Sequence, residues 1–197
     1  MSADRKIKFF ESLDVQTRRN FLKLAAMAGV SSSVIFSNPV SSLALGKDGD
    51  VKIMNVALGL EHQAIAAYNA GAGTKLLSDP VLKLAVKFLK QHEQHRDALA
   101  ATIKKFGGKP VDALANYDVA KIAAGVGVTA LASEGDIIKL AARLEEQATK
   151  AYLANVANFE SKDVIKAASA IAADEAAHTA ILTNALGEFA NSKSYLG

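Results

Sequence analysis

The sequence predicts an all-α protein, a four-helix bundle with a long crossover between its second and third helices. Apolar residues recur at spacings of three and four along four long segments, and no stretch shows the two-residue alternation of a β-strand. Abundant alanine and only three prolines also favour helix. A nine-residue motif occurs twice, as LEHQAIAAY at Leu60–Tyr68 and LEEQATKAY at Leu144–Tyr152, with six of nine positions identical. Each copy precedes a second helical segment that carries a histidine, which indicates a duplicated helical hairpin.

The first hairpin is delimited by glycine, proline and a capping residue. We expect its first helix from about Asp50 to Ala70, ended by the glycines of 71–73. The second helix begins at Ser78-Asp79-Pro80, where a capping residue precedes a proline at the first helical position. The glycine pair 107–108 ends it.

The second hairpin follows a connection of mixed composition. Lys109–Ala132 contains proline and glycine as well as apolar residues, and we expect one short helix in it, Val119–Ala124. The third helix is expected from Ser133 to about Phe159, and the fourth from Lys162 to Leu186, capped by Ser161. So long a connection suits a bundle whose two hairpins do not simply run up and down.

The N-terminal segment, residues 1–44, has the features of an export signal. The pair Arg18-Arg19 precedes an uncharged run of 13 residues, Leu24–Phe36, which is too short to span a membrane. Small residues at Ser42 and Ala44 fit a signal-peptidase site. The segment resembles a twin-arginine signal peptide cleaved after Ala44, which leaves 45–197 as the domain. Alternatives are an uncleaved anchor and an amphipathic helix with a chance arginine pair.

This resemblance implies that the translocase of the twin-arginine pathway is a partner and that the protein is periplasmic or otherwise exported. The basic excess of the chain also lies in this segment. Residues 1–44 hold six of the 23 basic and three of the 20 acidic residues, which leaves 17 of each in the remainder. Nothing there has the basic footprint of a nucleic-acid-binding protein.

Charged residues occupy positions of the helical stripes where a bundle is normally apolar. Burying ionised carboxylates together is unfavourable unless cations compensate them. Glu175 and His178 lie one helical turn apart on one face, where both reach a shared ion. The chain has no cysteine, so a metal here must be held by carboxylates and imidazoles, a set that suits iron or manganese, with zinc as an alternative.

These residues resemble the metal-binding pattern of the ferritin-like superfamily, and of its rubrerythrin-type members in particular. That pattern combines one glutamate from each of two helices with a Glu-x-x-His pair from each of the other two. The resemblance implies a ferritin-like four-helix bundle that binds two iron ions, or manganese. The candidate metal ligands are Glu61, His92, His95, Glu145, Glu175 and His178. It also implies that Tyr68 and Tyr152 hydrogen-bond to carboxylates across the bundle, where they position a proton or intercept radicals.

One position departs from the pattern, because His92 stands where a glutamate is expected. Three glutamates then face two divalent ions, so one positive charge remains. This excess favours the divalent state of the metal, recruits an anion, or weakens the metal position near His92. We expect Glu93, Asp174 and Glu146 to face solvent, and His62, which is rotated off the stripe, to be exposed.

The favoured function is redox chemistry at a dimetal centre, acting on peroxide or oxygen or oxidising Fe(II). A small-molecule oxidant or Fe(II) would be the partner, and a homodimer is a candidate assembly. Two alternatives remain: metal binding or storage without turnover, and a stress-related structural bundle in which the ligands form only a buried polar network. The sequence leaves open whether the protein is an enzyme.

Overall fold

A computed structural model of the chain describes residues 46–188. Its helices are α3 (Gly46–Gly73), α4 (Asp79–Lys105), α5 (Val119–Gly125), α6 (Glu134–Val156) and α7 (Lys162–Ala185). This part of the chain contains no β-strand, so the predicted all-α fold is confirmed. None of its helices has the length and apolarity needed to cross a membrane. The predicted export signal, 1–44, lies outside the described residues.

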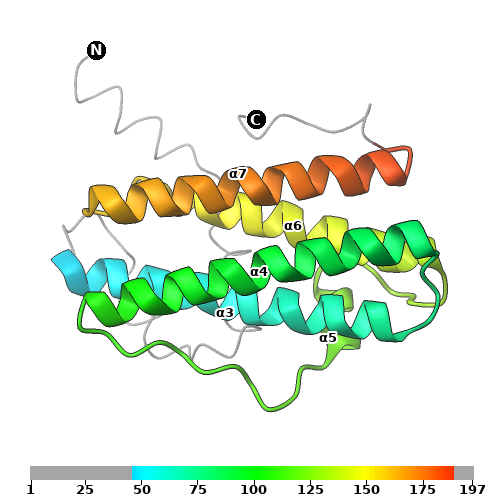
Figure 1. Cartoon of the computed structure of the whole chain (residues 1–197), viewed down its shortest axis with the longest axis horizontal. Coiled ribbons are helices and arrows are strands. Elements are labelled where there is room, and N and C mark those ends of the chain that lie inside the picture. Colours follow the sequence, from blue (N-terminus) through cyan, green and yellow to red (C-terminus); the bar gives the residue numbers. More distant parts are fainter. Residues whose placement is uncertain (1–45, 189–197) are drawn as a thin grey trace.

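The four long helices form two hairpins that pack against each other. α3 pairs with α4 and α6 pairs with α7, and the two hairpins meet mainly through α3 and α6 (Figure 1). α4 and α6 point in the same direction, so the chain has to travel the length of the bundle between them (Figure 1). This connection is the predicted long crossover, and it carries the short helix α5.

Serine residues set the starts of the helices of the second hairpin. The hydroxyl of Ser133 accepts a hydrogen bond from the backbone N–H of Asp136, whose carboxylate accepts one from the N–H of Ser133 in return. This reciprocal capping box fixes the start of α6. The hydroxyl of Ser161 accepts a hydrogen bond from the N–H of Val164 at the start of α7. The caps therefore place the starts of both helices within a residue of the expected positions.

α3 differs from the sequence-based expectation at both ends. It begins at Gly46 rather than Asp50, and it continues through the glycines that were expected to end it. A Cβ atom at Gly71 would lie 2.9 Å from Cγ2 of Ile137. Gly71 therefore serves the close packing of α3 on α6 rather than helix termination. α6 ends at Val156, three residues before the expected Phe159.

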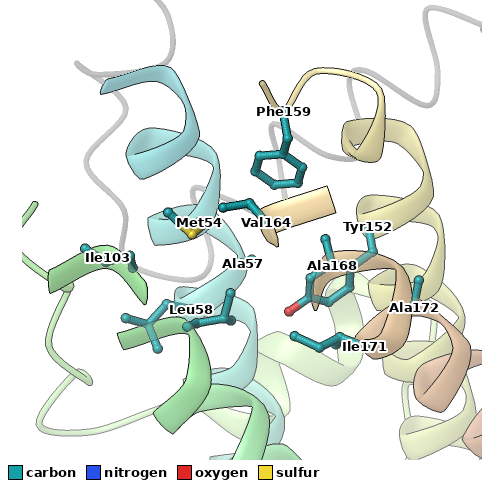
Figure 2. Packing of buried hydrophobic residues seen from close by; sticks show 11 residues of the cluster. Met54, Ala57, Leu58, Ile103, Tyr152, Phe159, Val164, Ala168, Ile171 and Ala172 are labelled. Carbon is teal, nitrogen blue, oxygen red and sulfur yellow. The ribbon is translucent and has the colours of Figure 1, made fainter. Parts of the chain in front are cut away.

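Of the three apolar clusters in the described residues, two lie on either side of the middle of the bundle. One cluster surrounds Met54, Ile103 and Phe159 and includes Tyr152 (Figure 2). The other surrounds Phe88 and includes Tyr68, Ile138, Ala142 and Leu182. The two tyrosines of the repeated motif thus belong to different clusters, and the polar residues of the stripes lie between them.

Asp50 shows how the first helix fixes the start of the last. Its side chain is buried, and its two carboxylate oxygens accept hydrogen bonds of 3.0 Å from the backbone N–H groups of Glu160 and Ser161. Both N–H groups precede the first turn of α7 and lack helical partners. Asp50 therefore caps a neighbouring helix rather than its own.

We predict that Asp50→Ala destabilises the protein by about 3 kcal/mol, because two hydrogen bonds to a buried charge are lost. The free energy of unfolding from urea titrations measures this. Asp48→Ala is the matched control, because Asp48 is an exposed acid in the first turn of the same helix. Equal losses in the two variants would show that the cap does not contribute.

Candidate metal centre

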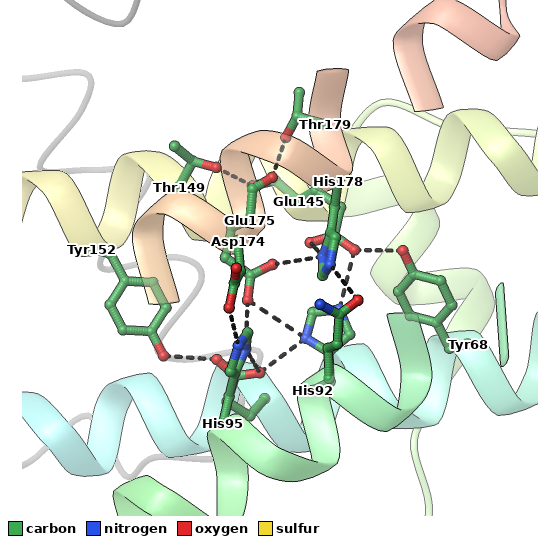
Figure 3. A network of polar contacts seen from close by, with 12 residues as sticks. Tyr68, His92, His95, Glu145, Thr149, Tyr152, Asp174, Glu175, His178 and Thr179 are labelled. Atoms are coloured by element: carbon green, nitrogen blue, oxygen red, sulfur yellow. Dashed lines mark hydrogen bonds and ion pairs between the residues drawn. The ribbon is translucent and has the colours of Figure 1, made fainter. Parts of the chain in front are cut away.

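All six residues predicted as metal ligands converge in the middle of the bundle (Figure 3). α3 contributes Glu61, α4 contributes His92 and His95, α6 contributes Glu145, and α7 contributes the remaining two. Each is buried, with at most 7% of its surface exposed. Such burial of three carboxylates requires compensating positive charge nearby.

The six residues form two overlapping groups. Glu61 and His95 complete the first group, and Glu145 and His178 complete the second. His92 and Glu175 belong to both. Within each group, one candidate ligand atom per residue lies within 4.8 Å of all the others. The arrangement therefore offers two neighbouring four-ligand sets that share two residues.

Three polar atoms in the second group test whether these residues fit a cation. Oε2 of Glu145, Oε2 of Glu175 and Nδ1 of His178 are buried and have no hydrogen-bond partner. The nitrogen lies 3.4 Å from the first oxygen and 3.5 Å from the second. Buried polar atoms without a partner are unfavourable, and a divalent ion among these three would satisfy all of them. The residues present therefore fit a metal ion, and their oxygen and nitrogen atoms suit iron or manganese.

Two residues that sequence reasoning did not select orient the histidines. Nε2 of His95 donates a hydrogen bond to Oδ2 of Asp174 at 3.2 Å. Nε2 of His178 donates one to Oε1 of Gln91 at 3.1 Å. Each contact leaves Nδ1 of the histidine facing the carboxylate cluster, which is the orientation that metal binding requires.

Asp174 was expected to face solvent, and the structure corrects this in part, because its half-exposed carboxylate also holds His95. The internal duplication could have identified both Gln91 and Asp174 as residues that support the histidines. Gln91 and Asp174 occupy equivalent positions, each immediately before one of the two shared residues.

The tyrosines of the repeated motif are hydrogen-bonded crosswise. Oη of Tyr68 donates to Oε1 of Glu145, and Oη of Tyr152 donates to Oε1 of Glu61 at 2.7 Å. Burial and the negative charge of the carboxylate partner raise the pKa of both tyrosines well above 10. Both therefore remain protonated donors, and both make the carboxylate contacts that the family resemblance implies.

His92 lies between two carboxylates. Its Nδ1 is 2.9 Å from Oε2 of Glu61, and its Nε2 is 3.0 Å from Oε1 of Glu145. Since carboxylates accept hydrogen bonds, both nitrogens donate, and the ring is an imidazolium. Burial alone would lower the pKa of His92, but the charge of Glu145 and hydrogen bonds to both glutamates raise it well above 6.5. His92 thus supplies positive charge to the cluster before an ion binds.

His95 acts similarly. Burial alone would lower its pKa, but hydrogen bonds to Glu175 and Glu61 raise it to about 10. Burial would raise the pKa of Glu61, whereas hydrogen bonds from both histidines lower it to about 2. Burial and the charge of Glu145 raise the pKa of Glu175 to about 7. An incoming metal ion therefore has to displace protons from imidazolium groups.

We predict that metal affinity falls as the pH falls, because the raised histidine pKa values keep protons on the ligand nitrogens. From pH 8 to pH 6 the apparent Kd for Mn(II) should rise about 100-fold for each proton displaced. Calorimetric titrations in buffers of different ionisation enthalpy count the released protons. An affinity independent of pH, with no proton release, would contradict this charge assignment.

The remaining charged residues of the motifs lie outside both groups. His62, which was expected to be exposed, is half-buried, and its Nε2 donates to the backbone oxygen of Val111 at 3.2 Å. This contact ties the crossover to α3. Glu146, which was expected to face solvent, is partly exposed and pairs with Arg143 and Lys150.

Comparisons with known proteins agree with this architecture. The fold is similar to the crystal structure of a conserved hypothetical protein, rv2844, from Mycobacterium tuberculosis, with a TM-score of 0.62 and 26% sequence identity. That similarity covers 71% of this chain and 92% of the other. No curated protein sequence matches this chain significantly. The sequence profile of the ferritin-like domain matches residues 49–188, which include α3 from its fourth residue and the whole of α4, α6 and α7. The chain therefore belongs to the ferritin-like domain family.

Proposed function

We propose that this protein binds two iron or manganese ions and carries out redox chemistry on oxygen or peroxide, or oxidises Fe(II). The observation that carries the proposal is the pair of overlapping four-ligand sets, buried in the middle of the bundle. Such sharing would keep two ions close together, the arrangement that two-metal chemistry requires. The family membership supports it, because carboxylate-rich dimetal sites occur in ferritin-like bundles.

The residues of the centre have two roles: some would bind the ions, and others hydrogen-bond to those ligands. Glu61 and His95 would hold one ion and Glu145 and His178 the other, while His92 and Glu175 belong to both ligand sets. A bound pair of ions would supply the capacity to exchange electrons with the oxidant. The two motif tyrosines would hold the single glutamates and present a phenolic proton at each end of the cluster.

The charge of the ligand cluster affects which oxidation state of bound metal ions is favoured. Its three carboxylates carry fewer negative charges than the four that would neutralise two divalent ions. This deficit disfavours any further gain of positive charge, so we propose that the divalent state is preferred unless an anion also binds. His92 is the residue that produces the deficit.

Metal content and turnover test the proposal together. The protein is loaded anaerobically with Fe(II) or Mn(II), freed of excess metal, and analysed for bound ions; Fe(II) oxidation and peroxide consumption are then followed. Two ions with turnover are the expected result. Two ions without turnover would favour storage, and only trace metal would contradict the proposal and leave a structural bundle.

Metal binding without turnover is the second candidate function, and one observation favours it. The imidazolium groups of His92 and His95 compensate the buried carboxylates when no ion is bound. A cluster that is stable in both forms suits reversible uptake and release. Exchange of bound Mn(II) with a chelator on a scale of minutes, without catalysis, would support it.

We also propose that the protein is exported by the twin-arginine pathway. The support is the order of features in the leader: Arg18-Arg19, an uncharged run, and the small residues that end at Ala44. Replacing both arginines with lysine should retain the protein in the cytoplasm, measured by fractionation. Arg5→Lys is the control outside the motif. Unchanged export of the double variant would contradict this route.

A further inference from the structure

A small apolar cavity adjoins the second ligand set, at the end of the cluster where Tyr68 lies. It has a volume of about 30 Å³, is lined by residues of the four long helices and by Leu77 of the turn between α3 and α4, and is partly open to solvent. Leu144, next to the ligand Glu145, forms one wall, and Leu182, one turn beyond His178, forms another. Tyr68 also lines the cavity and donates a hydrogen bond to Glu145, so the cavity adjoins the second ligand set.

The lining determines what the cavity can hold. Among the residues around it, the only polar side-chain atom is Oη of Tyr68, and that hydroxyl already donates to Glu145. A buried water needs two to four polar partners and about 10–15 Å³, so water has the space here but lacks the partners. Apolar cavities therefore favour apolar molecules such as xenon over water. This volume suits a molecule of two or three heavy atoms.

A comparison of the two copies of the motif shows that the cavity lies beside the end of the first copy, where the residues are smaller than those after the second. Gly71 and Ala72 follow Tyr68 and line the cavity. The equivalent positions after Tyr152 hold Asn155 and Val156, both larger. Val156 packs against the apolar cluster around Met54, so side chains occupy the corresponding region of the second copy.

We infer that this cavity is a binding site for a small apolar gas, and that dioxygen is the ligand it delivers to the Tyr68 end of the centre. The identification of dioxygen rests on the proposed redox function. Hydrogen peroxide would lose its hydrogen bonds to water on entering, with a single phenol to replace them, so the cavity discriminates against it. Dioxygen incurs no such loss.

Gas binding can be measured on the protein without metal. Dissolved dioxygen is paramagnetic and speeds the relaxation of nearby methyl groups, and xenon shifts their resonances. The methyls of Leu144 and Leu182 should respond more strongly than those of Ile103, which is fully buried away from the cavity. Ala72→Val places in the first copy the residue that the second copy carries, and it should abolish the excess response.

Ala70→Val is the matched control, because it makes the same change at an exposed position of the same helix and should leave the response intact. Ala85→Val fills the cavity from α4 if the first variant does not fold. Equal responses of Leu144, Leu182 and Ile103, or responses that persist when the cavity is filled, would overturn the inference. A protein that binds two ions but no gas refutes this site alone, whereas gas uptake without metal binding refutes the proposed function alone.

Discussion

Glu175→Ala is expected to abolish the binding of both metal ions, because Glu175 is the one carboxylate common to both ligand sets. A ligand that binds only the folded state stabilises it by about 4 kcal/mol at a free concentration 1,000 times its Kd. The wild-type protein should therefore gain about that much for each Mn(II) ion it binds, and the variant should gain nothing. Elemental analysis and urea unfolding with and without metal measure the two effects.

Glu93→Ala is the matched control for this experiment. Glu93 lies on α4 next to His92, is only partly buried, and belongs to neither ligand set. Its removal should leave metal content and metal-dependent stabilisation at wild-type levels. The assigned site would be wrong if Glu175→Ala retained two ions, or if both variants lost metal equally.

His92→Glu is expected to make folding depend on metal. The variant restores the fourth glutamate of the ferritin-like pattern but removes the imidazolium between Glu61 and Glu145. Breaking a buried ion pair by removing one partner costs about 3–5 kcal/mol, so the metal-free variant should lose that much stability. Two divalent ions would balance its four carboxylates, so added Mn(II) should restore the loss. Urea unfolding in chelator and in metal separates the two states.

His62→Glu makes the same chemical change one residue from Glu61 but outside the cluster. It removes only the hydrogen bond to the backbone of Val111, worth about 1 kcal/mol. Added metal should not restore this smaller loss. Similar losses in the two variants, or a metal-free His92→Glu protein as stable as wild type, would show that His92 is not the internal counter-charge.

The bundle and the convergence of its ligands could be predicted because both follow from local periodicity and from the duplication. Spacings of three and four place Glu175 and His178 on one face, and the repeat assigns the same face to Glu61 and Glu145. Once the hairpins pack, these faces meet. The helix starts at Ser133 and Ser161 were predictable for the same reason, because a capping residue acts on its own first turn.

Contacts between residues far apart in the chain were not predictable in this way. In the sequence Asp50 was expected to begin its own helix, yet in the structure it caps α7, about 110 residues later in the chain. Gly71 was expected to end its helix, yet its lack of a side chain leaves space for the side chain of Ile137. Asp174 was expected to face solvent because it lies beside the buried face of its helix and not on it. Only the packing of α4 on α7 brings His95 within hydrogen-bond distance of its carboxylate. Each depends on the distance between helices, which periodicity does not specify.

The crosswise tyrosine contacts have a consequence for how the two halves relate. Each hairpin supplies a phenol to the glutamate of the opposite hairpin and none to its own. The histidine supports cross over as well, from Gln91 to His178 and from Asp174 to His95. One hairpin in isolation thus completes neither end, whereas two identical hairpins would complete both by self-association. When the two hairpins are joined in one polypeptide, their sequences no longer have to be identical. Each hairpin can then diverge in sequence, although its site residues still depend on contacts from the other hairpin.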